Sequence, residues 1–588
     1  MPELSQSDLV ETKISIFIAL KIALIGIAEY NILMSKKLTL LILSLVGLFL
    51  VLGSIITVAV IDRPLANRQS VSFLASTGDS LVGTYYPGTE PAGVILLEGF
   101  GSDQVTMTSL ASEFARSGWH VFTFDFSGHG RSPGTLTFDN AQTDRLAYQA
   151  LSGLEEFKLQ SGLRSDQILV VGHSLGARVA LQSATMNPQQ VAGLVLLGAQ
   201  VNLSKNVQSE FFTGTTDADL PWVQVLGREN PRVPILLISG VWDDILTPEN
   251  AELLFEQLGG IKGDNNRTLI VLPGIVHNYE PFSSKVLNQI NIWIDGLSIH
   301  TPDLFRIYTE KSDFFADGFI QLPVSPTIRI LCWVLGLIGL LMFFTCGNRL
   351  LSLSDTGTKR LSNPEVVNVN RFLWGKFLLW LGALPVALIL GSLFFFIPLG
   401  KPVFNLIYVG FIGGYGILLL ILYKRGKMPG VQGKLPFMTE QTPFKWKRLL
   451  AALAIVIGML ILTAAYARTG WYYVFPINIR LVWLVIFTPF TALGFWIGLH
   501  EAQMLPQQRG VQIALTLIGL FPFFLYALLM AAIGSLSGMI GGFQGLIVLW
   551  LVLAFGNFVQ TVGHRPWMTA ICMAVLLYWL ILPQGVLF

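Results

Sequence analysis

The chain alternates between long apolar runs and one long stretch of mixed polarity. A helix that spans a bilayer needs roughly 20 mostly apolar residues, and the first clear run of this kind covers residues 38–61. From about residue 63 to residue 326 the composition is that of an ordinary soluble protein. Apolar runs then return and predict eight further spans, at 329–346, 377–398, 403–423, 449–467, 480–499, 511–533, 540–561 and 567–586. The pattern therefore predicts an all-α polytopic transmembrane region that is interrupted by one soluble domain.

The first 37 residues are predicted to form a cytoplasmic tail that contains one ambiguous segment. Residues 14–34 are apolar but are interrupted by Lys21 and Glu29. The favoured interpretation is an amphipathic helix at the membrane surface, and the alternative is a tenth span. The polar prelude is too long for a cleavable signal peptide, so we interpret 38–61 as a retained transmembrane anchor.

Basic residues are distributed unevenly between the two sets of predicted loops. One set holds fourteen of them: Arg349, Lys359, Arg360, Arg371, Lys376, Lys424, Arg425, Lys427, Lys434, Lys445, Lys447, Arg448, Arg509 and Arg565. The opposite set holds three: Lys401, Arg468 and Arg480. Because Lys and Arg accumulate in cytoplasmic loops, we expect a multi-pass integral membrane protein whose N-terminus is cytoplasmic and whose soluble domain is extracytoplasmic.

Within the soluble stretch, β-branched and aromatic runs alternate with helical patterns. Predicted strands cover 71–76, 81–87, 93–99, 120–126, 167–172, 191–199, 233–240 and 268–274, and predicted helices cover 108–118, 141–160, 177–186 and 284–297. The alternation predicts a doubly wound, mostly parallel α/β sheet. We assign this domain to 69–299, a linker to 300–328, and a transmembrane domain of about eight helices to 329–588.

Composition narrows the possible partners and cofactors. Of the 588 residues, 53% are hydrophobic and only 13% are charged, and the mean hydropathy is +0.61. The formal net charge of +2 gives no indication of nucleic-acid binding. The three cysteines, Cys332, Cys346 and Cys572, all lie in apolar runs, so a disulfide framework is not expected. The sequence contains no cysteine–histidine metal cluster, and we expect neither a metal nor a cofactor.

The first candidate catalytic motif along the chain is the pentad Gly172-His173-Ser174-Leu175-Gly176. It has the form G-x-S-x-G, and it joins a predicted strand to a predicted helix, which is the context that exposes a nucleophilic serine. A serine hydroxyl needs a histidine base and an acid that orients this base. Asp243 and Asp244 follow the strand 233–240, and His277 follows the strand 268–274. All these side chains therefore belong to the carboxyl edge of the sheet, where α/β proteins bind ligands.

Five segments together resemble the α/β-hydrolases, in particular the serine aminopeptidase and monoacylglycerol lipase-like group: LLEGFGSD (96–103), FDFSGHGRSPG (124–134), GHSLG (172–176), GVWDDILTP (240–248) and LPGIVHN (272–278). The resemblance covers about 40% of the chain. It implies a nucleophile at Ser174, a base at His277 and an acid at Asp243, with Asp244 as the alternative acid. It also implies that the backbone N–H groups of Phe100 and Leu175 form the oxyanion hole. Glu98 departs from the His-Gly that the family usually has in this loop.

These observations predict a membrane-bound serine hydrolase that cleaves carboxylic esters of lipids or acyl groups. An acyltransferase or a peptidase with the same triad is an alternative. Two further alternatives are a lipid-handling or transport protein with an accessory hydrolase-fold domain and a catalytically inactive binding domain. The segment 201–231 is too short for a large lid and carries Phe211, Phe212 and Trp222. We expect these aromatic residues to face the bilayer and the substrate to come from the membrane.

Overall fold

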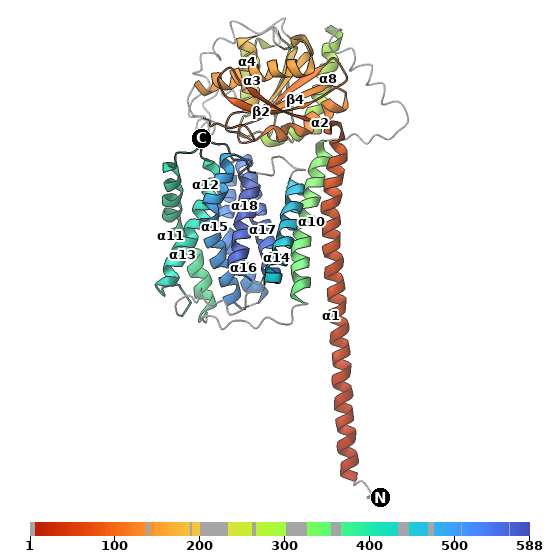
Figure 1. Ribbon diagram of the computed structural model, residues 1–588, viewed down its shortest axis with the longest axis vertical. Coiled ribbons are helices and arrows are strands. Elements are labelled where there is room, and N and C mark those ends of the chain that lie inside the picture. The colour runs from red at the N-terminus through yellow and green to blue at the C-terminus, as the bar shows by residue number, and fades with distance from the viewer. Residues whose placement is uncertain are drawn as a thin grey trace, which may run out of the picture.

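The structure is a computed structural model, and Figure 1 shows an α/β domain above a region made only of helices. Between the two lies the end of the chain marked C. The described residues are 6–136, 141–187, 191–199, 233–260, 266–300, 326–353, 366–432, 446–467, 476–506, 508–563 and 565–588.

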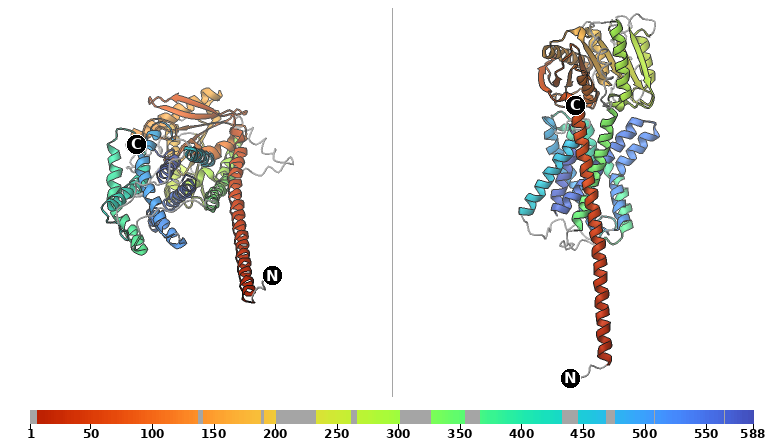
Figure 2. Two further views of the ribbon diagram at one scale, coloured as in Figure 1. Left: turned by 60° about the horizontal axis from the view of Figure 1, so that its bottom comes forward. Right: turned by 90° about the vertical axis from the view of Figure 1, so that its right-hand side faces the viewer.

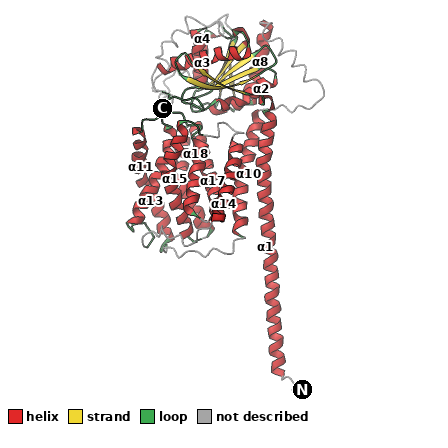
Figure 3. Ribbon diagram, viewed as in Figure 1, coloured by secondary structure: helices red, strands yellow, loops and turns green. Residues whose placement is uncertain are grey.

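An eight-stranded sheet forms the centre of the α/β domain (Figure 3), in the order β1-β2-β4-β3-β5-β6-β7-β8. The strands are β1 (Gln69–Leu74), β2 (Ser80–Tyr86), β3 (Gly93–Leu97), β4 (His120–Asp125), β5 (Ile168–His173), β6 (Gly193–Leu197), β7 (Ile235–Gly240) and β8 (Arg267–Leu272). The first two form an antiparallel hairpin, β2 pairs antiparallel with β4, and all the remaining pairs are parallel. Strands β3, β5, β6 and β7 are buried along their whole length, as expected where both faces of a parallel sheet are covered.

Helices cover both faces of the sheet. On one face, α3 (Ala141–Ser161), α4 (Leu175–Met186) and α7 (Pro248–Gln257) share a hydrophobic core with the strands. On the other face, α2 (Thr108–Arg116) and α8 (Ser284–His300) form a second core. The predicted doubly wound α/β-hydrolase fold is therefore confirmed. Helix α7 is the one long element of the domain, within its described residues, that the sequence pattern did not predict.

The helical region begins with one continuous helix, α1 (Gln6–Ile61), which extends far beyond the other helices (Figure 2). Residues 14–34 continue the helix that contains the predicted anchor, and both interpretations of this segment stay predictions. Helix α10 (Pro326–Ser352) lies beside the part of α1 near the α/β domain. The two backbones approach closely at Gly47 and Gly339. A Cβ atom added at Gly47 would lie only 2.7 Å from the carbonyl oxygen of Gly339.

The short helix α12 (Leu406–Tyr408) continues through a π-helical turn into α13 (Gly414–Lys424). The other helices of this region are α11 (Val369–Leu393), α14 (Trp446–Ala467), α15 (Ile479–Met504), α16 (Arg509–Ala532), α17 (Leu536–Gly563) and α18 (Pro566–Ile581). All nine predicted spans fall on helices. Among the described residues, seven helices are long and apolar enough to cross a membrane. The apolar helices Leu453–Ala467 and Pro566–Ile581 are shorter.

Two basic residues that the sequence analysis counted as loop charges lie inside helices and are buried. Lys376 belongs to α11 and forms an ion pair with Glu501 of α15. The hydroxyl of Tyr423 donates to the other carboxylate oxygen of Glu501 over 2.9 Å. Arg480 occupies the first turn of α15, at the end near the α/β domain, and is 1% exposed. Both charges are compensated by specific partners, which explains how they can be buried.

Candidate active site

The carboxyl edge of the parallel strands faces the helical region. Three loops at this edge contact it: the loop after β3, through Phe100; the loop after β4, through Gly128 and Gly130; and the loop after β7, through Asp244. Figure 1 shows the same arrangement, with the α/β domain seated directly on the ends of the helices. All the site residues predicted from the sequence therefore lie between the two parts of the molecule or close to their boundary.

Ser174 stands on a sharp turn between β5 and α4. Its φ is 55° and its ψ is −114°, a conformation that non-glycine residues rarely adopt and that marks functional strain. The turn needs glycine on both sides. A Cβ at Gly172 would lie 2.3 Å from the carbonyl oxygen of Gly176, and a Cβ at Gly176 would lie 2.4 Å from that of Leu97. Gly172 thus allows the turn to fold back closely on itself, and Gly176 allows it to approach the end of β3.

His277 and Asp243 meet beside this turn. The Nδ1 atom of His277 is 2.7 Å from Oδ2 of Asp243, and both side chains are buried. The backbone N–H groups of Ile245 and Leu246 donate to the other oxygen, Oδ1, over 3.0 and 2.8 Å. Since the carbonyl of His277 accepts a hydrogen bond from Nε2 of His173 over 3.0 Å, His277 lies next to the residue that precedes Ser174.

The two neighbouring aspartates have different partners. Whereas Asp243 contacts His277, the carboxylate of Asp244 points to the start of α17. It accepts hydrogen bonds from the hydroxyl of Ser535 over 3.0 Å, from the hydroxyl of Ser537 over 2.6 Å and from the backbone N–H of Ser537 over 3.0 Å. A carboxylate at the first turn of a helix is favourable because the unpaired N–H groups and the helix dipole are positive there. The geometry favours Asp243, and not Asp244, as the acid that orients His277.

The two predicted oxyanion donors lie on either side of this turn. Leu175 is the first residue of α4, so its backbone N–H has no acceptor within the helix. Phe100 lies in the loop after β3, directly after Gly99, and a Cβ at Gly99 would be 3.3 Å from the Cβ of Ser174. The Phe100 ring packs against His129 of the same domain and against Phe404 and Phe588 of the helical region, with centroid distances of 6.0–6.3 Å.

Glu98, the departure from the family pattern, is fully buried below the loop that carries Phe100. Its Oε1 accepts a hydrogen bond from the backbone N–H of Phe126 over 3.0 Å. Burial, together with the nearby carboxylates of Asp125 and Asp103, raises the pKa of Glu98 well above its ordinary value. The protonated, neutral form is therefore favoured, and it places no negative charge beside a developing oxyanion.

His173 and Glu280 are two buried groups behind His277 to which the sequence analysis gave no role in a site. Burial, and to a lesser extent His277, lowers the pKa of His173 to about 3. Burial and the nearby Asp243 raise the pKa of Glu280 well above its ordinary value. Ligand atoms of His173, His277 and Glu280 lie within 4.8 Å of one another. Because metals bind the deprotonated carboxylate, a neutral Glu280 fits a role in supporting His277 better than a role as a metal ligand.

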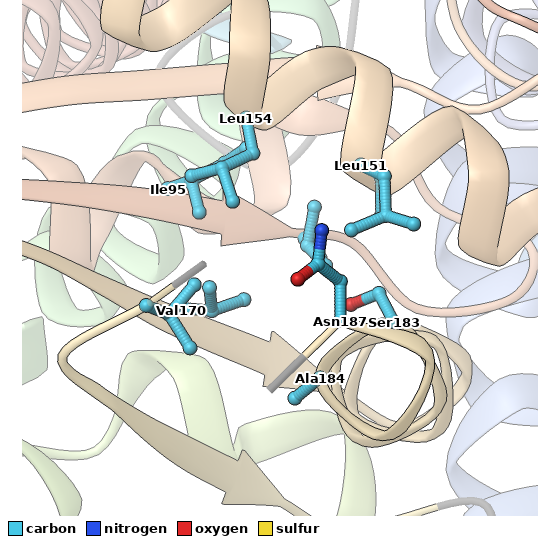
Figure 4. A pocket seen from close by; sticks show the side chains of 10 residues that line it. Ile95, Leu151, Leu154, Val170, Ser183, Ala184 and Asn187 are labelled. Atoms are coloured by element: carbon cyan, nitrogen blue, oxygen red, sulfur yellow. The ribbon is translucent and has the colours of Figure 1, made fainter. Parts of the chain in front are cut away.

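One small cavity lies under α3 and α4, away from Ser174 (Figure 4). Ile95, Leu154, Val170 and Asn187 contribute to its lining. Its volume of about 10 Å³ has room for about one water molecule, so it cannot hold a substrate. The aromatic residues Phe211, Phe212 and Trp222, which were expected to face the bilayer, lie outside the described residues.

The most important residue that sequence reasoning missed is Arg480. Its guanidinium hydrogen-bonds the carbonyl oxygens of Gly128 and Gly130, in the glycine-rich loop after β4, and that of Gly585 near the end of the chain. Its partners are backbone atoms up to 352 residues away, so no local pattern in the sequence could indicate them. The position of an arginine at the start of an apolar run was the only signal, and it was interpreted as a loop charge.

Comparison with known proteins gives a consistent result for the α/β domain. The family model described as "Serine aminopeptidase, S33" matches residues 89–232. An uncharacterised protein of Mycobacterium tuberculosis is 30% identical over 217 residues, which cover 34% of this chain and 69% of that protein. A monoacylglycerol lipase of Mycolicibacterium smegmatis is 26% identical over 178 residues, which cover 29% of this chain and 58% of the lipase.

Solved structures are similar over the same part of the chain. An esterase of Pyrococcus furiosus aligns with a TM-score of 0.32 and 18% identity, over 39% of this chain and 92% of the esterase. Across the curated relatives compared, the chain spans between 31% and 69% of their own length.

The sheet order, the strained serine turn and the sequence matches agree, and the chain belongs to the serine aminopeptidase S33 family of α/β-hydrolases.

Proposed function

We propose that this protein is a membrane-bound serine hydrolase that cleaves carboxylic esters of lipids or acyl groups through Ser174, His277 and Asp243. One observation carries the proposal: the residue that precedes a serine in strained backbone geometry hydrogen-bonds a buried histidine, and Nδ1 of this histidine is 2.7 Å from a buried carboxylate. This is the arrangement by which a serine hydroxyl becomes a nucleophile at neutral pH.

The reaction follows from the place of each group. The Oγ of Ser174 attacks the ester carbonyl while His277 takes the hydroxyl proton. Asp243 holds the Nδ1–H of His277 and stabilises the imidazolium that forms. The N–H groups of Phe100 and Leu175 stabilise the oxyanion. His277 then gives its proton to the leaving alcohol, and water, activated in the same way, releases the acid from Ser174.

An apolar substrate from the membrane agrees with the surroundings of the site. The site edge of the sheet faces the apolar helical region, and the aromatic cluster of Phe100, Phe404 and Phe588 lies at this boundary. Val241 and Trp242, directly before Asp243, are 48% and 57% exposed. The names of the relatives, among them a monoacylglycerol lipase, also favour ester substrates. Acyl transfer or peptide cleavage would use the same triad.

The transport alternative finds less support. The buried charges of the described helices are compensated: Lys376 pairs with Glu501, and Arg329 at the start of α10 pairs with Asp62 at the end of α1. Ionisable residues inside a helical bundle commonly pair with one another. A fixed ion pair fits a role in joining helices better. A catalytically inactive domain is disfavoured because Ser174, His277 and Asp243 are all present, His277 is paired with Asp243, and Ser174 lies on a strained turn.

We predict that Ser174→Ala abolishes labelling by a fluorophosphonate probe, since only an activated serine reacts rapidly with it. His277→Ala should reduce the labelling rate to nearly the same extent, because the members of a triad act as a unit. Ser183→Ala is the matched control: it removes another buried hydroxyl from α4 and should label like wild type. Undiminished labelling of folded Ser174→Ala would show that the nucleophile lies elsewhere.

We predict that the α/β domain lies on the extracytoplasmic side, because the basic loops of the helical region accumulate on the other side. In a background without the three native cysteines, Gln160→Cys in α3 should react with a membrane-impermeant maleimide on intact cells. Lys427→Cys, after α13, should react only once the membrane is opened. Both positions are exposed, so accessibility within the protein does not limit the reaction. The reverse pattern would contradict the orientation.

We predict that Trp242→Ser weakens turnover of long-chain esters in liposomes. Burying a large apolar side chain contributes about 1.5–3 kcal/mol, so kcat/KM for long chains should fall at least about 10-fold if Trp242 contacts lipid or acyl chain. Short, water-soluble esters should be hydrolysed as by wild type, because the triad is unchanged. Leu159→Ser, which removes an even more exposed apolar residue from α3, should change neither rate. Equal loss for short and long chains would contradict the membrane-side substrate.

A further inference from the structure

Arg480 is a deeply buried connection between the two parts of the molecule, with 1% of its surface exposed. It belongs to α15, yet its side chain leaves the helix and enters the glycine-rich loop of the α/β domain. Its Nη1 donates to Gly130 over 2.8 Å, its Nη2 to Gly128 over 2.8 Å, and its Nε and Nη2 to Gly585 over 3.1 and 2.8 Å. One planar group thus joins three backbone carbonyls from two distant segments, which only arginine can do.

The glycine-rich loop held by Arg480 supports the loop of the oxyanion hole on its other side. Its first residues contact that loop twice: the N–H of Phe126 donates to Glu98, and the ring of His129 packs edge-on against Phe100. Asp125 fixes the loop from within, because it accepts hydrogen bonds from the N–H groups of Gln104 and Arg131, each over 2.8 Å. The glycine-rich loop therefore lies between Arg480 and the backbone that positions Phe100.

The last residues of the chain complete this connection. The N–H of Leu587 donates to Gly128 over 2.9 Å, and the carbonyl of Leu587 accepts from Leu136 over 2.8 Å. The next residue, Phe588, pairs with the backbone of Lys401 through two hydrogen bonds, and its ring packs against Phe100. These residues form a backbone bridge from the helical region to the glycine-rich loop and to the residue of the oxyanion hole itself.

A second, separate contact reaches the opposite side of the site. Asp244, the neighbour of Asp243, is held by Ser535 and Ser537 at the start of α17. Asp243 and Asp244 are consecutive, so a shift of α17 relative to the α/β domain moves the loop that presents the acid to His277. The helical region thus holds both the oxyanion side and the acid side of the site.

We propose that the helical region is a positioning part of the active site, in which Arg480 fixes the oxyanion loop and the start of α17 fixes the loop of Asp243. The inference rests on the proposed serine hydrolase function, and it adds that docking of the α/β domain on the helices sets its activity. Arg480 touches no reacting atom and acts through the loop that it holds. It should therefore affect the transition state, where the oxyanion forms, more than the binding of substrate.

The test compares Arg480→Gln and Arg480→Lys with wild type in the full-length protein. Loss of one oxyanion donor costs about 10²–10³-fold in kcat, and a displaced donor should cost a part of this, so we expect kcat for a short soluble ester to fall at least about 10-fold in Arg480→Gln. KM should change less than about 3-fold, because the variant changes no side chain that is proposed to contact the substrate. Arg480→Lys keeps the charge but carries its three donors on one atom and lacks the planar fork of arginine, so it should restore little of the activity.

The matched control is the double variant Lys376→Gln with Glu501→Gln. It replaces a buried ion pair in the same region, near the far end of α15, the helix that has Arg480 in its first turn. The 21 residues from Arg480 to Glu501 correspond to about 32 Å of α-helix. This variant should lower the thermal stability of the helical region but leave kcat and the labelling rate with fluorophosphonate unchanged. A loss of activity as large as that of Arg480→Gln would show that any disturbance of the helices suffices, and would overturn the specific role.

A milder variant keeps the proposal testable if Arg480→Gln does not assemble. Ser537→Ala removes one hydroxyl bond to Asp244 and leaves the backbone N–H bond. It should fold and lower kcat by about 2–10-fold with little change in KM. The proposal would be overturned if folded Ser537→Ala has the wild-type kcat and the Arg480 variants either have the wild-type kcat as well or fail to assemble. Labelling of wild type at Ser174 is measured in parallel, and its absence would instead contradict the proposed function.

Discussion

The guanidinium of Arg480 is the interaction on which the arrangement of the molecule depends. An arginine buried to this extent is costly unless its donors are paired, and three glycine carbonyls from both parts of the chain supply that pairing. The pairing works only when the glycine-rich loop of the α/β domain, the end of the chain and the first turn of α15 meet at one point. Their meeting fixes which edge of the sheet faces the helices, and this is the edge that carries Ser174, Asp243 and His277.

This orientation explains why a serine hydrolase is joined to so apolar a chain. A simple anchor could hold the domain by any surface, whereas here the helices contact the loops that surround the serine. Phe404 and Phe588 pack on Phe100, and Ser537 binds Asp244. The helical region therefore contributes to the walls of the site. Under the proposed function, an ester whose acyl chain is dissolved in the bilayer would reach Ser174 along this boundary without passing fully through water.

The sequence predicted much of the α/β domain, because its signals are local. The alternation of strand and helix patterns predicted the sheet. The glycines Gly172 and Gly176, which permit a close approach, predicted the turn that carries the serine. The structure also brings the predicted acid and base, Asp243 and His277, into contact, since both follow strands whose carboxyl ends share one edge. The choice between Asp243 and Asp244 needed the structure, because only the fold shows that one points to His277 and the other to α17. Arg480 and Lys376 were misplaced in loops for the same reason: their partners lie far away along the chain.

The central claim, that the site opens towards the helical region, is tested most directly by cross-linking from the serine. A fluorophosphonate with a long alkyl chain and a photoreactive group at its far end would be attached to Ser174 in membranes, illuminated, and its cross-linked peptides identified by mass spectrometry. The account predicts cross-links in the helical region, around Phe404 and the start of α17, and none at a comparable yield in α3. Cross-links confined to α3, α4 and the other helices of the α/β domain would contradict it, because the alkyl chain would then leave the site away from the membrane helices.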